Sequence, residues 1–336
     1  IRDSVASLGS EMCIRDRAQR LHPSSATGIW RRQLAIQASG AAPVGFIGIG
    51  AMGFPMAQRL MARGHALVVH DTSPESVTAL GAQSAASPRE VAQRCEVVFC
   101  CLPSLEAYRT VVLGADGLRE GRRMTHYVHL GTTGSALVEE FENTLTRCMT
   151  IDAPVTGGPA NAVEGRLTSI VSASNEALAT CRAMIESYSA HLIVVSHRPG
   201  AAQQMKLINN IVSAANLAVA CEALVVGARA GLDPAMIVQV FNRGSGQNSA
   251  TLTKIPAAVL TRSFDWGAAL RIVLKDGAQF LRDADAAGVP VEVARAVIES
   301  YRRAASIEGP DADMTTVIRQ LERAADLHAT VLPLPS

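Results

Sequence analysis

Short apolar runs alternate with helical patterns over the first half of the chain. From Val44 onward the sequence reads VGFIGI, MAQRLMARG, ALVVHD, PESVTALG and EVVFCCLP. Apolar runs rich in β-branched residues, separated by segments of helical periodicity, are typical of β-α-β units that build a parallel sheet. Ser87, Pro88 and Glu90 form a capping box at the start of one expected helix. More strands are expected at residues 126–130, 149–154, 167–173 and 191–195.

After Gly200 the strand pattern stops and helical periodicity takes over. The segment 201–232 contains few charged residues: Lys206, Glu222 and Arg229. So few charges predict a helix that is buried on most of its circumference. Gly231 and the Asp233-Pro234 pair predict its end and the start of the next helix. Further helices are expected at residues 234–243, 267–287, 291–305 and 314–327.

These patterns predict an α/β N-terminal domain followed by an all-α C-terminal domain. The boundary falls at Pro199 and Gly200, which gives domains of residues 44–199 and 200–327. A length of 336 residues agrees with two domains. No apolar run of about 18 residues is free of polar breaks, so no transmembrane helix is expected.

The first 43 residues follow no such pattern. The triplet IRD at Ile1 recurs at Ile14, and IRDSVASLGSEMCIRDR resembles translated adapter sequence. We therefore expect residues 1–43 to be a tail outside both domains. Residues 18–43 carry Arg and Ser without acidic residues, so a transit peptide is the alternative interpretation.

The charged residues nearly balance, with 31 Lys and Arg against 30 Asp and Glu. A net charge of +1 provides no basic surface of the kind that binds nucleic acid or an anionic membrane. Seven cysteines without a CxxC pair indicate neither a disulfide framework nor a zinc site, which favours a reducing, cytoplasmic location. His126 and His129 would point to opposite faces of their strand, so no metal site is expected there.

The first expected strand runs into the glycine-rich loop Gly48-Ile49-Gly50-Ala51-Met52-Gly53, and a helix follows directly. A strand, such a loop and a helix together are typical of a Rossmann-type dinucleotide-binding domain. Gly48 permits the tight turn, Gly50 lets the backbone approach a pyrophosphate, and Gly53 lets helix and strand pack closely. The helix N-terminus favours the phosphate charge. The loop, with Ala51 and Met52, is therefore an expected cofactor site, and a structural glycine turn is the alternative.

Asp71 ends the second expected strand, 18 residues after Gly53. Its carboxylate is placed to accept hydrogen bonds from the adenosine ribose hydroxyls and would repel a 2′-phosphate. The two residues after Asp71 bring no arginine to offset that repulsion. NAD is therefore favoured over NADP, although NADP stays open.

The later strand EVVFCCLP ends at the carboxyl edge of the sheet, where open α/β sheets bind their ligands. Leu102 and Pro103 are therefore expected to contact the cofactor. Cys100 and Cys101 are expected to be buried strand residues rather than reactive thiols, because no His or Lys lies beside them in the sequence.

Four segments carry a resemblance to a known enzyme family. GFIGIGAMGFPMAQRL, DAPVTGGPANAVEGRL, GAAQQMKLINN and LKDG occur in this order between Val44 and Leu327. They resemble the dinucleotide loop, substrate signature, catalytic helix and later lysine–aspartate motif of the β-hydroxyacid dehydrogenases. That family includes 3-hydroxyisobutyrate dehydrogenase and tartronate semialdehyde reductase and is related to 6-phosphogluconate dehydrogenase. The resemblance implies that Lys275 lies beside the cofactor, and that the chain forms a homodimer or homotetramer.

Lys206 and Asn210 are four residues apart on an expected helix, so both side chains can contact one ligand. Gln203 lies on the same face. Oxidation of an alcohol needs a base, and lysine can act as one if burial or a second cation lowers its pKa from about 10.4 toward neutrality. Lys206 is therefore expected to be the acid/base, with Asn210 holding the substrate oxygen. A lysine that merely extends to water is the alternative.

Thr156, Gly157 and Gly158 are expected to bind the substrate carboxylate through backbone N–H groups and one hydroxyl. An ordinary loop explains the two glycines equally well at the local level. Thr156 stands where the family usually has Ser. Arg166 stands where the family usually has Thr, and it either donates to a second anionic group of the substrate or is solvated.

The segment HLGTTGS departs further from the family pattern, which usually reads Asp-x-Ser-Thr there. His129 and Gly131 replace the Asp and the Ser. Thr132 remains, and it is retained as an expected cofactor contact.

The sequence thus predicts an NAD(P)-dependent oxidoreductase that reversibly oxidises a small, 3-hydroxyisobutyrate-like β-hydroxyacid to its semialdehyde or oxo acid. An imine or keto reductase on the same scaffold is one alternative. A non-catalytic dinucleotide-binding module is another, although the presence of Lys206 argues against it. No single spacing identifies the hydroxyacid.

Overall fold

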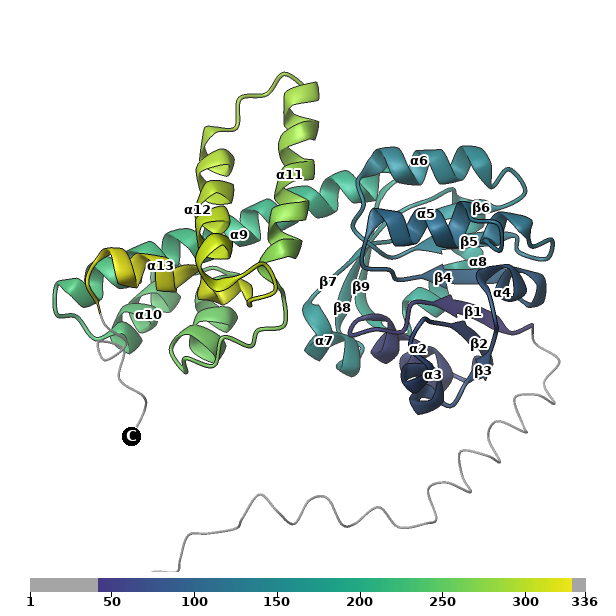
Figure 1. The fold of residues 1–336 in the computed structure, drawn as a ribbon, viewed down its shortest axis with the longest axis horizontal. Helices are drawn as coiled ribbons and strands as arrows, with labels where there is room; N and C mark the ends of the chain where they lie inside the picture. Colours follow the sequence, from purple (N-terminus) through teal and green to yellow (C-terminus); the bar gives the residue numbers. More distant parts are fainter. Residues whose placement is uncertain (1–41, 328–336) are drawn as a thin grey trace, which may run out of the picture. The chain divides into compact units, whose positions relative to one another are not determined.

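The computed structural model describes residues 42–327. The two interpretations of the N-terminal segment, a tail or a transit peptide, therefore fall on residues that are almost all outside the described part. Within it, strands alternate with helices as far as Ser196, and the chain is helical from Ala201 onward (Figure 1). The predicted fold class, an α/β Rossmann-type domain followed by helices, is confirmed.

The strands of the described chain form one sheet. They are β1 Val44–Ile47, β2 Leu67–His70, β3 Gln83–Ser84, β4 Val97–Cys100, β5 His126–His129, β6 Met149–Asp152, β7 Val155–Thr156, β8 Leu167–Ser172 and β9 Ser189–Ser196. The order β3-β2-β1-β4-β5-β6 is parallel throughout, and β8 joins β6 in the opposite direction. The chain reverses its direction across the sheet between β1 and β4, where α/β sheets of this order bind dinucleotides.

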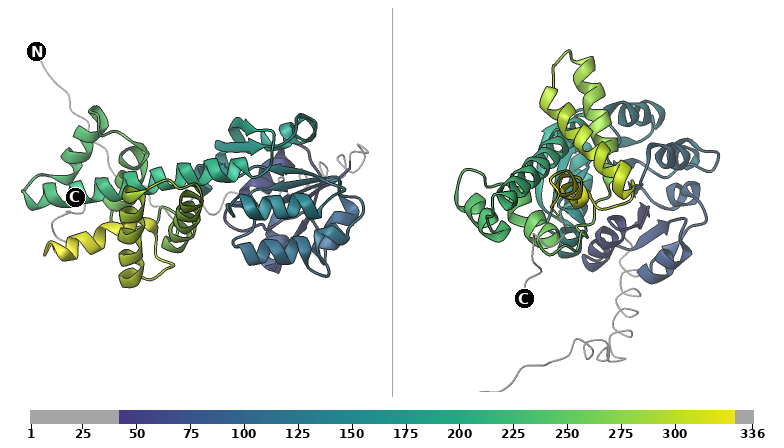
Figure 2. Two further views of the ribbon diagram at one scale, coloured as in Figure 1. Left: turned by 90° about the horizontal axis from the view of Figure 1, so that it is seen from above. Right: turned by 60° about the vertical axis from the view of Figure 1, so that its left-hand side comes forward.

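Helices lie against the sheet on both faces (Figure 2). They are α2 Gly53–Ala62, α3 Pro74–Leu80, α4 Pro88–Arg94, α5 Leu105–Leu113, the short 3₁₀ helix η1 Leu118–Glu120, α6 Ser135–Thr144, α7 Gly158–Glu164 and α8 Asn175–Ile185. The hydroxyl of Ser87 accepts a hydrogen bond from the backbone N–H of Glu90, so the predicted N-cap of α4 is confirmed. The Glu90 carboxylate accepts from the N–H of Ala86 instead of Ser87.

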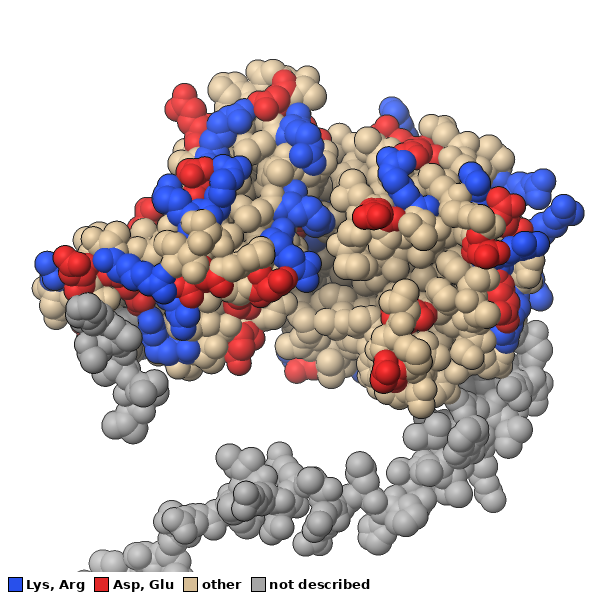
Figure 3. Space-filling model, viewed as in Figure 1, with Lys and Arg blue, Asp and Glu red and all other residues tan. Residues whose placement is uncertain are grey.

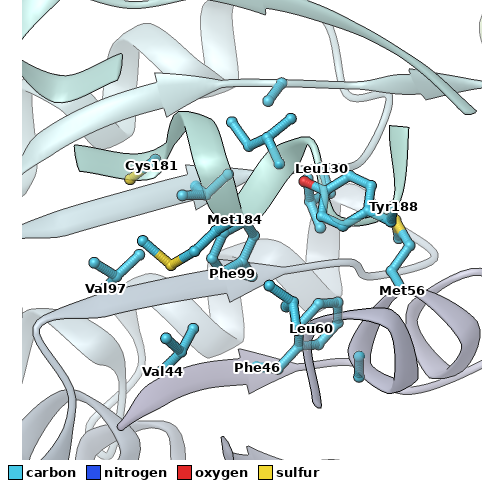
Figure 4. Packing of buried hydrophobic residues seen from close by; sticks show 14 of the residues in the cluster. Val44, Phe46, Met56, Leu60, Val97, Phe99, Leu130, Cys181, Met184 and Tyr188 are labelled. Atoms are coloured by element: carbon cyan, nitrogen blue, oxygen red, sulfur yellow. The ribbon is translucent and has the colours of Figure 1, made fainter. Parts of the chain in front are cut away.

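The two faces of the sheet support separate apolar cores, because alternate residues of each strand point to opposite sides. On one face Phe46 of β1 stacks on Phe99 of β4, with ring centroids 5.9 Å apart, and Tyr188 meets Phe99 edge-on (Figure 4). The neighbouring residues Ile47 and Val98 belong to the core on the other face. Burial on both sides fixes the strand ends that carry the candidate site.

The second half of the chain packs around one long helix. Its elements are α9 Ala201–Arg229, α10 Pro234–Arg243, the π-helix η2 Ala250–Val259, α11 Leu270–Ala286, α12 Glu292–Glu308, the 3₁₀ helix η3 Met314–Thr316 and α13 Val317–Ala324. α9 contacts the sheet near its start and α10, η2, α11, α12 and α13 farther along. Asp233 caps α10 by accepting from the N–H of Ala235, as the Asp233-Pro234 pair predicts.

α9 is less buried than its sequence suggests. Only 44% of its most apolar window is buried within the described chain, so the expectation of burial on most of its circumference is wrong for a single chain. With a mean hydropathy of 1.9 over that window, α9 is also long and apolar enough to cross a membrane by length and composition alone, contrary to the sequence expectation. Its packing against α6, α10, η2, α11, α12 and α13 and its buried Lys206 favour a core helix.

Positive and negative side chains are interspersed over the face seen in Figure 3, above all on the helical second half. Exposed ion pairs of the helical second half include Arg271 with Asp311 and Arg302 with Glu299.

Candidate active site

The glycine-rich loop after β1 leaves open space at its middle glycine. A Cβ at Gly48, whose φ is 86°, would lie 2.2 Å from the carbonyl oxygen of Cys101, and a Cβ at Gly53 would lie 1.9 Å from that of Gly48. At Gly50 a Cβ would meet nothing within 4 Å. Gly48 and Gly53 therefore serve close packing, whereas Gly50 leaves room for a pyrophosphate above the N-terminus of α2. The loop, in which Ala51 is exposed and Met52 half-buried, fits a dinucleotide.

Asp71 fastens the end of β2 to this loop. Its Oδ2 accepts a hydrogen bond from the N–H of Ile49 at 2.7 Å, and its Oδ1 accepts from the N–H of Ser73 at 2.8 Å. Each carboxylate oxygen retains a free lone pair, so Asp71 can still accept from ribose hydroxyls. No Lys or Arg follows in residues 72–76.

The end of β4 lies against the same loop. A Cβ at Gly48 would come within 2.9 Å of a methyl group of Leu102, which places Leu102 and the adjacent Pro103 beside the turn. Burial raises the pKa of Cys100 well above its usual value and that of Cys101 to about 12. Both thiols therefore stay protonated and are poor nucleophiles.

The polar residues around Lys206, the expected catalytic lysine, come from α9 and α11. Asn210 Nδ2 donates to Oδ2 of Asp276 at 2.7 Å, and Asp276 Oδ1 lies 2.9 Å from the Lys275 ammonium. Lys206 is only 8% exposed, and its ammonium forms no hydrogen bond or ion pair within residues 42–327. Burial lowers the pKa of Lys206 to about 8, with Asp276 opposing this shift and Lys275 adding to it. Near pH 8 such an amine can both accept and donate a proton.

Lys275 connects this group to the sheet. Its ammonium donates to the backbone carbonyl of Thr132, in the loop after β5. Two residues expected separately to contact the cofactor are thereby in direct contact, although 143 positions separate them in the sequence.

Gln203 and Asp152 anchor the first turn of α9 to that same loop. Gln203 Oε1 accepts from the N–H groups of Thr133 and Gly134, and Nε2 donates to the carbonyl of Gly131. Asp152, at the end of β6, accepts from the Gln203 side chain at 2.7 Å and from the backbone N–H of Gln203 at 3.2 Å. Lys206 is one turn farther along this anchored helix.

His129 and Gly131, the two departures from the family pattern near Thr132, both belong to one buried cluster. His129 stacks on Tyr108 with centroids 4.2 Å apart and is hydrogen-bonded to the hydroxyls of Tyr127 and Thr133 at 2.9 Å each. Burial lowers the pKa of His129 to about 3, so the ring is neutral. A Cβ at residue 131 would lie 2.5 Å from the Tyr108 hydroxyl, so only glycine fits beside this cluster.

The expected carboxylate-binding segment begins at Thr156, the last residue of β7, and continues into the loop after it. Thr156 is half-buried, and Gly157 and Gly158 have φ values of 131° and 76°, which favour glycine. No hydrogen bond joins this segment to Lys206 or Asn210 among the described residues. Arg166 is exposed and pairs with Glu164, which favours the solvated interpretation of that side chain.

Asp276 and Asp152 belong to this group of residues, although no sequence pattern identified either of them. Asp276 is adjacent to Lys275 in LKDG, and Asp152 begins DAPVTGG, so both lie in segments already singled out. Their partners are 66 and 51 residues away, and helical or strand spacing gives no signal for such pairs.

Two family models match the chain. Residues 43–196 match the NAD-binding domain of 6-phosphogluconate dehydrogenase, and residues 200–321 match the NAD-binding family of NADP-dependent 3-hydroxyisobutyrate dehydrogenase. Mouse mitochondrial 3-hydroxyisobutyrate dehydrogenase is 28% identical over 291 residues, which cover 83% of this chain and 87% of the mouse protein. An uncharacterised oxidoreductase of Shewanella frigidimarina is 30% identical over 84% of this chain and 99% of its own length. 2-(Hydroxymethyl)glutarate dehydrogenase of Eubacterium barkeri is 27% identical over 83% and 95%, respectively.

Solved structures agree with these relatives. The 3-hydroxyisobutyrate dehydrogenase of Salmonella typhimurium superposes with a TM-score of 0.75 at 25% identity and covers 83% of this chain and all of its own. The complex of Psf3 with NADP⁺ has the same TM-score at 26% identity, over 83% of this chain and 99% of its own. An imine reductase from Pseudomonas reaches a TM-score of 0.55 at 16% identity over 84% and 100%, which shows the fold alone.

Proposed function

Since this chain belongs to the NAD(P)-dependent β-hydroxyacid dehydrogenase family that includes 3-hydroxyisobutyrate dehydrogenase, we propose that it reversibly oxidises a small β-hydroxyacid to its semialdehyde or oxo acid. The observation that carries this proposal is the buried Lys206, whose ammonium is unpaired among the described residues and whose neighbours are Asn210 and Asp276. A buried, unpaired amine beside a fixed amide is a costly arrangement unless a ligand uses it.

Lys206 moves the proton of the reaction. Burial brings the pKa of Lys206 to about 8, so a large fraction of the amine is unprotonated near that pH and can accept the hydroxyl proton of the substrate. NAD, when bound, would supply the hydride acceptor. In the reductive direction the ammonium returns the proton to the developing alkoxide. Asp276 raises the pKa of Lys206 and therefore keeps the ammonium form accessible for that direction.

Asn210 and the segment after β7 orient the substrate. Asp276 accepts one N–H of the Asn210 amide at 2.7 Å, and Asn210 Oδ1 accepts from Asn209 Nδ2 at 3.3 Å. These bonds fix the rotamer and leave the second N–H of Asn210 to donate to the substrate oxygen. The backbone N–H groups of Gly157 and Gly158 and the Thr156 hydroxyl are the proposed donors to the carboxylate. Two adjacent residues with positive φ suit a concave group of N–H donors for an anion.

NAD is the proposed cofactor in preference to NADP. The support is Asp71, whose carboxylate is hydrogen-bonded to the glycine-rich loop at Ile49 and is followed by no basic residue in residues 72–76 that could bind a 2′-phosphate.

The proposed assembly is a homodimer or a larger homo-oligomer that covers α9. Apolar residues follow one exposed face of α9 at intervals of three, four and seven residues, which is the spacing of a helix–helix contact. They are Met205, Ile208, Val212, Val219 and Val226. A second copy of the chain is the proposed occupant of this face.

A direct test is the steady-state oxidation of a hydroxyacid panel with NAD, with Lys206→Met compared to the wild type. The variant is expected to lose about 10² to 10⁴ in kcat while NADH affinity persists, because a general base contributes about that much. The exposed neighbour Gln204, changed to Ala, is the matched control and is expected to retain activity. Near-normal turnover in Lys206→Met, or no turnover of any hydroxyacid by the wild type, would contradict the proposal.

A further inference from the structure

Lysine is scarce in this chain and confined to one region. The 31 basic residues comprise 28 arginines and only three lysines, Lys206, Lys254 and Lys275. Two of these three contribute to the site described above. Every other basic residue is an arginine, and Lys254 is the one lysine that has no role in that site. Lysine differs from arginine in being a compact charge whose pKa shifts readily on burial.

Lys254 is a buried cation without a counter-ion. It lies in the π-helix η2, a conformation often found at functional sites, and is 8% exposed. Its ammonium donates to the Ser213 hydroxyl at 3.1 Å and lies 5.6 Å from the centre of the Trp266 ring. It forms no ion pair with any carboxylate in residues 42–327. The nearby cation Arg262, by contrast, is paired with Glu322.

The two contacts of Lys254 place it beside the proposed substrate site. Ser213 lies on α9 three residues after Asn210 and seven after Lys206, so all three side chains share one face of the helix. Trp266 precedes Gly267, where an added Cβ would lie 3.9 Å from Pro159, and Pro159 directly follows the carboxylate-binding segment. Lys254 therefore lies between the face of α9 that carries Lys206 and Asn210 and the loop that is proposed to bind the substrate carboxylate.

A buried ammonium that only a hydroxyl and an aromatic ring solvate has lost most of its hydration. Burial lowers its pKa, which is the expected sign for a cation that lacks a carboxylate partner. An anionic group that enters beside it would restore the balance of charge. One ammonium matches the single charge of a carboxylate better than the charge of about −1.5 to −2 on a phosphate.

We propose that Lys254 binds a second carboxylate of the substrate, so that the preferred substrates are hydroxy-dicarboxylic acids. The inference rests on the proposed function, because it takes Lys206 and the segment after β7 as the site of the reacting hydroxyl and the first carboxylate. Ser213, whose hydroxyl accepts from Lys254, lies two turns beyond Lys206 on α9, about 10 Å along the helix axis. A substrate that reaches both lysines therefore needs an arm of several bonds between its hydroxyl and its second carboxylate.

Three substrates with the same reacting centre test this assignment. 3-Hydroxyisobutyrate has one carboxylate, 2-(hydroxymethyl)glutarate adds an arm that ends in a second carboxylate, and 2-(hydroxymethyl)pentanoate has an uncharged arm of similar length. The wild type is expected to prefer the glutarate over the pentanoate by about 30-fold or more in kcat/KM, which corresponds to the loss of one partner of a buried charge pair. This comparison needs no variant.

Lys254→Met should then lower kcat/KM for the glutarate by about 30-fold or more and change the values for the other two substrates by less than about threefold. Lys254→Arg keeps the charge and should retain most of the preference. Thr253→Val, an exposed neighbour on η2, is the matched control. A wild type that treats the glutarate and the pentanoate alike overturns the inference, and so does a Lys254→Met variant that loses activity equally on all three.

Calorimetric binding of 2-(hydroxymethyl)glutarate to the NADH-loaded protein separates this inference from the proposed function. Binding by the wild type that Lys254→Met weakens by about 30-fold or more supports the carboxylate site even if no substrate is oxidised. Turnover of 3-hydroxyisobutyrate without any effect of Lys254→Met on glutarate binding supports the proposed function and overturns the inference.

Discussion

The side-chain amide of Gln203 donates a hydrogen bond to Asp152 Oδ1 at 2.7 Å, and both side chains are fully buried. Gln203 belongs to the first turn of α9, and Asp152 ends β6. The same amide also accepts from the N–H groups of Thr133 and Gly134. This pair therefore fixes the start of α9, which carries Lys206, against the loop that carries Thr132.

Gln203→Ala is expected to lower the free energy of unfolding by about 2 to 4 kcal/mol, because it leaves several buried donors and acceptors unsatisfied at roughly 1 kcal/mol each. Gln204→Ala, at the exposed next position, should change it by less than about 0.5 kcal/mol. Urea denaturation of both variants measures the difference. Equal stability of the two variants would show that the hydrogen bonds of Gln203 make no net contribution to the free energy of unfolding.

The pH dependence of hydroxyacid oxidation reports on Lys206. Burial lowers its pKa to about 8, and the Asp276 carboxylate opposes that shift. Oxidation needs the unprotonated amine, so kcat should rise with pH through about 8. Asp276→Asn removes the charge that favours the ammonium, so its profile should rise at lower pH than that of the wild type. A profile that moves to higher pH would contradict this role of Asp276.

Substitutions at two glycines of the loop after β1 should separate cofactor binding from folding. Gly50→Ala adds a Cβ into open space, so the protein should fold normally but bind NADH at least about tenfold more weakly, since the methyl occupies the approach of the pyrophosphate. Gly53→Ala places a Cβ 1.9 Å from the Gly48 carbonyl oxygen and should lower the melting temperature instead. Thermal denaturation and NADH titration of both variants measure the two effects. Undiminished NADH affinity in Gly50→Ala would argue against this loop as the pyrophosphate site.

Local patterns predict the parts of the site that adjacent residues build. The glycine loop follows from a strand, three glycines and a helix, and the shared face of Lys206 and Asn210 follows from helical periodicity. The pair Asn210–Asp276 does not follow, because the contact depends on how α11 packs on α9 and no sequence period reports that packing.

Backbone conformation and side-chain exposure are also only partly predictable from local sequence patterns. The short strands β3 and β7 have two residues each and carry too little periodicity to be recognised, and nothing in the sequence of residues 250–259 distinguishes a π-helix from an α-helix. The long helix with few charges is compatible with assembly between chains, but its sequence does not show which apolar residues are exposed. The pattern of apolar positions does not distinguish a residue that its own chain buries from one that a second chain buries.

Cofactor preference tests the role of Asp71. At equal concentrations NADH should raise the melting temperature more than NADPH does, because the Asp71 carboxylate repels a 2′-phosphate. Asp71→Asn keeps an acceptor for the ribose and removes the charge, so the ratio of the two dissociation constants should fall by about tenfold. Titration of both cofactors against the wild type and the variant measures that ratio. Equal protection of the wild type by NADH and NADPH would contradict a preference for NAD.

The exposed apolar row on α9 predicts a self-associating surface. Val219 and Val226 are 58% and 69% exposed in the single chain, on the face that also carries Met205 and Ile208. A glutamate at either valine would place a charge in a contact between two copies, at a cost of several kcal/mol once desolvated. Val219→Glu and Val226→Glu should therefore shift the mass measured by light scattering from that of an oligomer to that of one chain. Val293→Glu, at a valine that is 75% exposed on α12, should leave the mass unchanged. A wild type that is already monomeric, or variants at Val219 and Val226 that keep the mass of the wild type, would exclude this face of α9 as the contact, because burying a charge without a partner is incompatible with an intact apolar interface.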